Sequence, residues 1–166
     1  MPGVVQMELL GVRLELPANA PVVLLREHGG GRRVLPIYIG QEEAKAIALA
    51  LDGVTTPRPM THDLMRDLLV AVGASVQRIV LTELRESTFF AEVELVVAGQ
   101  VHRVSSRPSD AIALAVRVEA AIFASDEVLN EGAATATEGG RPEEQDQIGD
   151  EFRQFIEHVN PEDFSS

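Results

Sequence analysis

Short stretches with alternating apolar and polar residues recur along most of this chain, and they constrain its fold more than any other feature. The clearest are residues 10–16 and 89–97, and in the second Glu92 and Glu94 lie opposite the apolar face. A period of two is typical of strands with one buried face. The apolar positions of the first run are Leu10, Val12, Leu14 and Leu16. Further strands are predicted at 22–25, 34–39, 76–84, 101–104 and 121–124.

Three helices are predicted between these strands. Residues 41–51 carry an apolar stripe with helical spacing, and Gly53 ends that helix. A second helix follows the stiff loop 55–59, with Thr61 as its N-cap. Its inward residues are expected to be Leu64, Leu68, Leu69 and Val72. A third begins near Pro108 or Ser109 and is apolar almost all round, so we expect it to be buried.

These elements predict an α+β fold, in which a mixed β-sheet is packed with helices in a single compact domain. The domain is expected to cover residues 1–131, with Ser125 capping a short helical turn near its end. Residues 132–142 are small, polar and glycine-rich, which indicates a flexible linker. Residues 143–166 then predict an acidic, amphipathic C-terminal helix.

The predicted C-terminal helix has one apolar face and one acidic face. Residues 133–166 contain 9 of the 26 acidic residues but only 2 of the 14 basic ones, in a chain of net charge −12. We expect the apolar face to be buried against protein, because each such side chain stabilises by roughly 1.5–3 kcal/mol when buried. An acidic segment placed near arginines would compete with phosphate. The apolar residues of this face are Ile148, Phe152, Phe155, Ile156 and Val159.

Composition excludes several classes of protein. The absence of cysteine excludes disulfides, thiolate nucleophiles and Cys-ligated metal sites. There is no signal-type N-terminus and no apolar run of membrane-spanning length, so we expect a cytoplasmic protein that does not bind membranes. Neither a P-loop nor a dinucleotide-binding glycine pattern is present, and no organic cofactor is expected. The acidic charge disfavours nucleic acid at long range, although a local arginine cluster can still attract phosphate.

Two short segments share the same chemistry at predicted helix starts. They are Arg58-Pro59-Met60-Thr61-His62-Asp63 and Arg107-Pro108-Ser109-Asp110. One interpretation is structural: hydroxyl residues cap the helices, and the aspartates complement the helix dipoles. The other is functional, because helix N-termini and arginines together bind anions. Both interpretations remain open at this point, and we expect the two loops to lie close together in the folded protein.

In the functional interpretation each residue type has a role in phosphodiester hydrolysis. Arg58 and Arg107 would hold phosphate oxygens, and Thr61 and Ser109 would contact the substrate. His62 would orient or deprotonate water, as a general base. A hard cation such as Mg²⁺ or Mn²⁺ prefers carboxylate oxygens. The candidate ligands, of which the two aspartates are also catalytic candidates, are Asp63, Asp110, Glu42 and Glu43.

Three segments together resemble the bifunctional nuclease domain family. They are LPIYIGQEEAKAIALAL at 35–51, PRPMTHDL at 57–64 and SSRPSDAIALAVR at 105–117, and the resemblance covers roughly residues 7–131. It implies an α+β domain, a tendency to form homo-oligomers, and nuclease activity on both RNA and DNA. The hypotheses are therefore a nuclease, assisted by a divalent metal, or a non-catalytic domain that binds an anionic ligand or a partner protein.

Overall fold

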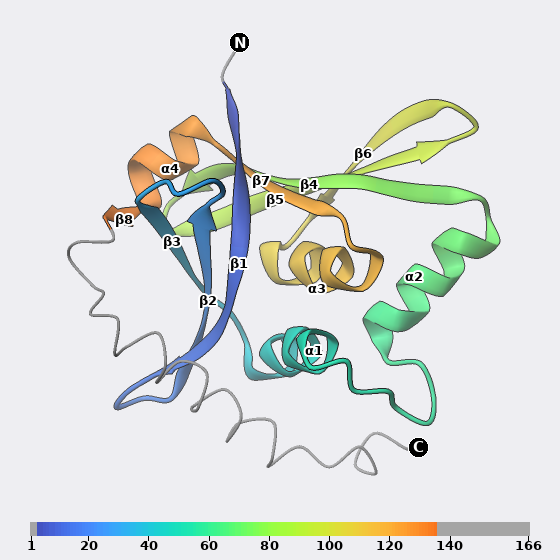
Figure 1. Ribbon diagram of the computed structural model, residues 1–166, viewed down its shortest axis with the longest axis horizontal. Helices are drawn as coiled ribbons and strands as arrows, with labels where there is room; N and C mark the ends of the chain where they lie inside the picture. The colour runs from blue at the N-terminus through green and yellow to red at the C-terminus, as the bar shows by residue number, and fades with distance from the viewer. Residues whose placement is uncertain (1–2, 136–166) are drawn as a thin grey trace.

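The computed structural model describes residues 3–135, which form one eight-stranded sheet with helices packed against it (Figure 1). The strand order is β6-β5-β4-β7-β1-β2-β3-β8. In this part of the chain β4 and β7 are parallel, and the other neighbouring strands are antiparallel. The predicted α+β class with a mixed sheet is confirmed. The strands are β1 Val4–Glu15, β2 Ala20–Glu27, β3 Arg33–Tyr38, β4 Ala74–Arg85, β5 Thr88–Val97, β6 Gln100–Ser106, β7 Ala121–Ser125 and β8 Ala134–Thr135.

The described helices are α1 Gln41–Leu51, α2 Thr61–Ala71, α3 Pro108–Val118 and α4 Asp126–Gly132. The sheet is bent, so that β1–β3 and β4–β6 run in different directions, and α1 and α3 lie in the angle between them (Figure 1). Helix α3 is central and contacts both α1 and α2. Its Ala111–Ala115 segment is buried, as its apolar composition predicts. This packing places the starts of α2 and α3 next to each other.

Strand β1 differs from its prediction in which side chains it buries. A bulge between Leu9 and Gly11 shifts the pairing with β2, and Gly11 has a φ of 145°. A bulge inserts one extra residue and reverses the alternation beyond it. Met7 and Val12, which have opposite parity, are therefore both buried. Leu16, predicted to face inward, is 76% exposed because it lies beyond the end of β1, in the turn that follows Glu15.

Helix α2 differs from its prediction in two ways. Met60, not Thr61, is the N-cap, and the Asp63 carboxylate accepts a hydrogen bond from the Met60 N–H at 3.0 Å. Three residues predicted to face the core are exposed: Leu64 at 49%, Leu68 at 57% and Val72 at 70%. The reason is the position of α2, which lies at the margin of the sheet beside α3 rather than over the centre (Figure 1). Most of its apolar stripe therefore has no cover among the described residues.

The end of the described chain extends into the segment predicted as a linker. Gly132 is the last residue of α4, and Val34 and Arg33 of β3 pair with Ala134 and Thr135 of β8. The predicted cap is confirmed at Ser125, whose hydroxyl accepts a hydrogen bond from the Val128 N–H. The rest of the linker and the predicted C-terminal helix lie outside the described residues. No helix within residues 3–135 has both the length and the apolar character that a membrane span requires.

Candidate functional site

A histidine–aspartate contact joins the starts of α2 and α3. His62 Nε2 lies 2.9 Å from Asp110 Oδ1, although 48 residues separate the two in sequence. His62 is 7% exposed and is buried because α2 packs against α3 at this point. The two segments with shared chemistry are therefore connected, and the connection runs through this pair. Arg58 is exposed and contacts no carboxylate within the described part of the chain.

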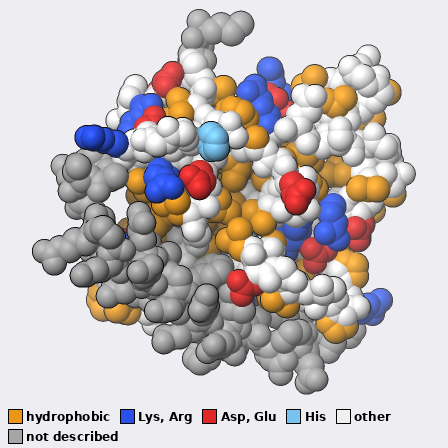
Figure 2. Space-filling model, in the orientation of Figure 1, with side chains coloured by type: hydrophobic (Ala, Val, Ile, Leu, Met, Phe, Trp, Pro, Cys, Tyr) orange, Lys and Arg blue, Asp and Glu red, His pale blue; other side chains and the backbone are white. Residues whose placement is uncertain are grey.

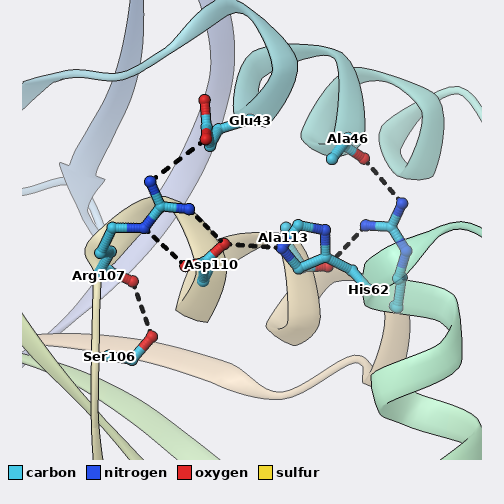
Figure 3. Close-up of polar contacts among 8 residues, drawn as sticks. Glu43, Ala46, His62, Ser106, Arg107, Asp110 and Ala113 are labelled. Atoms are coloured by element: carbon cyan, nitrogen blue, oxygen red, sulfur yellow. Dashed lines mark hydrogen bonds and ion pairs between the residues drawn. The ribbon is translucent and has the colours of Figure 1, made fainter.

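Arg107, the N-cap residue of α3, extends this contact into a chain of charges (Figure 3). Its Nε and Nη2 donate to the two oxygens of Asp110 at 2.8 and 3.2 Å. Its Nη1 donates to Glu43 Oε1 in the first turn of α1 at 3.3 Å. The Arg107 side chain is 64% exposed, so the cluster reaches the surface. His62, Asp110, Arg107 and Glu43 thus form one connected network from three helices.

A second arginine, Arg117, also contacts all three helices. Arg117 Nε donates to Asp63 Oδ1 at 2.6 Å, and its other nitrogens donate to the carbonyls of Ala113 and Ala46 at 2.9 and 3.0 Å. Its side chain is only 4% exposed. Asp63 therefore connects Arg117 of α3 with the Met60 N–H before α2. In this geometry Asp63 positions the helix that carries His62.

The electrostatics keep both aspartates ionised. Burial raises the pKa of Asp110, but hydrogen bonds from Arg107 and His62 outweigh burial and leave that pKa below its ordinary value. Burial also raises the pKa of Asp63, but the hydrogen bonds from Arg117 and the Met60 N–H outweigh it, so that this pKa too lies below its ordinary value. An ionised carboxylate can only accept hydrogen bonds. In the neutral form of the imidazole, the proton of His62 is therefore on Nε2, facing Asp110, and the lone pair is on Nδ1.

A groove of about 750 Å³ begins at this network. Its polar end contains Thr61, His62, Arg107 and Asp110. Ser105 and Ser106 also line it, and the other lining residues are apolar, with one wall formed by Met65, Leu68, Leu69 and Val72 of α2. Among the described residues on the face shown in Figure 2, basic side chains lie among acidic and apolar ones and form no continuous basic surface. The groove therefore combines a small charged site with a long apolar floor.

The remaining predicted site residues do not converge on one point of the groove. Ser109 is 6% exposed and lines a different hollow of about 330 Å³, on the other side of Arg107. Glu42 is exposed and contacts Lys45 at 3.1 Å. Asp63, Asp110 and Glu43 each contact an arginine. Within residues 3–135 no group of three or more His, Asp or Glu side chains is arranged to hold a metal ion.

Sequence reasoning did not identify Arg117 or the Glu43–Arg107 contact. Arg117 stands in the last turn of α3, where a basic residue is also explained by the helix dipole. Its position at the end of an otherwise apolar helix was the available signal, since a charge there must find a partner when the helix is buried. The Glu43–Arg107 contact spans 64 residues and has no local signature.

Comparison with known proteins identifies the family of this chain. Residues 23–137 match the family model of the bifunctional nuclease domain. An uncharacterized protein of Mycobacterium tuberculosis is 41% identical over 169 residues, covering 97% of this chain and 98% of that protein. Bifunctional nuclease 2 of Arabidopsis thaliana is 32% identical over 113 residues, which cover 64% of this chain and 34% of the plant protein. Bifunctional nuclease 1 of Oryza sativa subsp. indica is 25% identical over 114 residues, 66% of this chain and 34% of that protein.

Proposed function

Because the chain belongs to the bifunctional nuclease domain family, we propose that it is a nuclease that hydrolyses phosphodiester bonds in RNA, DNA or both. One observation carries this proposal beyond the family relationship: the His62–Asp110–Arg107 network at the polar end of the groove. It combines a candidate base, a carboxylate that orients that base, and an exposed cation for a phosphate. These are the groups that such a reaction requires.

In this mechanism His62 removes a proton from the attacking oxygen, which belongs to water or, in RNA, to the ribose 2′-hydroxyl. That oxygen bonds to phosphorus as the P–O bond to the leaving oxygen breaks, and the leaving oxygen takes up a proton from water. Asp110 holds the Nε2–H of His62, so that Nδ1 accepts the proton, and stabilises the imidazolium that forms. Arg107 neutralises charge on the phosphate. Its 3.3 Å contact with Glu43 is the longest in the network and the one that a phosphate oxygen can replace. We assign Thr61 to substrate contact because it lines the same groove as His62 and Arg107.

The carboxylates do not form a ready-made site for the divalent cation that sequence reasoning proposed. Such a cation needs several converging oxygens. Of the four candidate ligands, Asp63, Asp110 and Glu43 are each bound to an arginine, and Glu42 contacts Lys45. We therefore derive no step through a metal and assign Asp63 to positioning. Cleavage measured with chelator, and then with added Mg²⁺ or Mn²⁺, determines whether a cation takes part.

The test uses the full chain with a labelled single-stranded RNA and a plasmid DNA as substrates. We expect His62→Asn to lower the cleavage rate by at least about 100-fold, which is typical for the loss of a general base. The matched control is His28→Asn, the same change at an exposed loop residue, and it should keep full activity. Melting curves confirm that each variant is folded.

The control also distinguishes this protein from a contaminating nuclease, whose activity would be the same in both variants. Equal cleavage by the two folded variants would contradict the assignment of His62. No cleavage of either substrate by the unmodified chain would favour the alternative, a non-catalytic domain that binds an anionic ligand or a partner.

A further inference from the structure

The apolar part of the groove is built like a receptor for a helix. Leu68 and Val72 line it and are 57% and 70% exposed, which is unusual for two large side chains that also border a concave surface. Opposite them lie Val93 and Leu95 of β5 and Val104 of β6. Leaving such a surface in water is unfavourable. An apolar occupant of the groove would therefore stabilise the protein.

The same chain carries a segment with the matching pattern. Apolar residues at 148, 152, 155, 156 and 159 follow the spacing i, i+4, i+7, i+8, i+11, and acidic residues stand between them. Amphipathic helices bind hydrophobic grooves with anchors at this spacing. A helix this short is marginal by itself and gains stability from packing. We propose that residues 148–159 bind in the groove of their own chain, with this stripe against α2, β5 and β6.

Chain length permits this contact within one molecule. The described part ends at Thr135 in β8, at the opposite edge of the sheet from β6. Seven strand spacings of about 4.8 Å separate those edges, which is roughly 34 Å along a flat sheet, and bending brings the edges closer. The 13 residues from Thr135 to Ile148 span up to about 45 Å when extended. The connection is therefore longer than the width of the sheet that it has to cross for a contact within one molecule.

Charge does not determine the occupant. In the groove lining the carboxylate of Asp110 is paired with Arg107. The apolar stripe of residues 148–159 is therefore the feature that matches this groove.

A disulfide-trapping experiment tests the contact in the full chain, which has no cysteine of its own. One variant combines Phe155→Cys with Leu68→Cys, which lines the groove. Its control combines Phe155→Cys with Val70→Cys, which is 70% exposed on the same helix but does not line the groove. We expect the first pair to form an intramolecular disulfide at least about tenfold faster, because only that pair is held at high effective concentration. Equal rates for the two pairs, or a product that is mainly a cross-linked dimer, would overturn the proposal.

A fluorescence measurement keeps the apolar anchor in place and needs no nuclease activity. The chain has no tryptophan, so Phe155→Trp introduces a single reporter. We expect emission typical of a buried indole, unchanged over a 100-fold dilution because the contact is within one molecule. Adding Leu68→Glu should shift the emission to that of a solvated indole, and Val70→Glu should not. A solvated indole before any further change, or an equal response to both glutamates, would refute the binding of this segment.

Discussion

Replacing Arg117 with methionine should destabilise the protein, because this side chain connects three helices. The substitution Arg117→Met keeps most of the aliphatic stem and removes the guanidinium, with its contacts to Asp63, Ala113 and Ala46. The side chain is 4% exposed, so water cannot replace these contacts without disturbing the packing. Removing one partner of a buried ion pair typically costs about 3–5 kcal/mol. Asp63 retains 22% exposure, which favours the lower end of that range.

The assay is denaturant and thermal unfolding of the full chain. A loss of about 3 kcal/mol should lower Tm by about 6–12 °C in a chain of this size. A double-mutant cycle with Asp63→Asn then isolates the interaction, with a coupling energy expected above about 1 kcal/mol. A stability loss below about 1 kcal/mol would be typical of an exposed ion pair and would refute the reasoning, as would a coupling energy of zero.

The same pair predicts a specific pH dependence. The pKa of Asp63 in the folded protein is below its ordinary value of 3.8, because Arg117 and the Met60 N–H outweigh burial. A carboxyl with a lowered pKa stabilises the fold above its unfolded pKa, and the contribution is lost as pH falls through the folded value. The Tm difference between the unmodified chain and Asp63→Asn should therefore be constant from about pH 8 to 5 and shrink below about pH 4. A difference that grows on acidification would contradict the assignment.

Three further results are expected. Asp110→Asn should lower the cleavage rate by at least about tenfold, because His62 loses the carboxylate that sets its tautomer. Folded Asp63→Asn should keep most activity, and equal losses in the two variants would contradict their separate roles. The binding constant for single-stranded nucleic acid should depend only weakly on salt: a plot of its logarithm against the logarithm of the salt concentration should have a slope of about −1.4 or weaker, the value for two phosphate contacts. A slope near −4 would indicate a broad basic surface instead. Light scattering should return a multiple of 18.0 kDa, most simply a dimer, and a monomer across micromolar concentrations would reject the predicted homo-oligomer.

The elements of this fold were predictable because each carries a local signal. Gly40, Gly53 and Gly73 lie at the boundaries of α1 and α2, and period-two patterns mark the strands. Those signals depend on backbone geometry within a few residues, which the sequence expresses directly. The bulge at Leu9–Gly11 was not predictable in the same way, because a single inserted residue changes the parity of the strand without changing its composition.

The partners of buried charges could not be predicted. Glu94 follows the alternation of β5 and was expected simply to face away from the apolar side, yet it is 6% exposed. Arg78 binds it at 2.7 and 3.1 Å and lowers its pKa, and Arg78 in turn lies 5.1 Å from the ring centre of Phe123. The alternation along a strand predicts which face of the sheet a residue lies on. Which side chains cover that face depends on segments that are distant in the sequence.

The two similar segments show why shared chemistry alone did not define the site. Both precede a helix, but Arg107 is itself the N-cap of α3, whereas Arg58 stands three residues before α2 begins. An N-cap side chain lies over the first turn of its own helix, which is why Arg107 reaches Asp110 at i+3. Arg58 is too far from its helix for the equivalent contact with Asp63, which binds Arg117 instead. The two segments therefore contribute different groups. The first supplies His62, and the second supplies Asp110, which contacts His62, and Arg107, which contacts Asp110. The site forms only where α2 and α3 pack together.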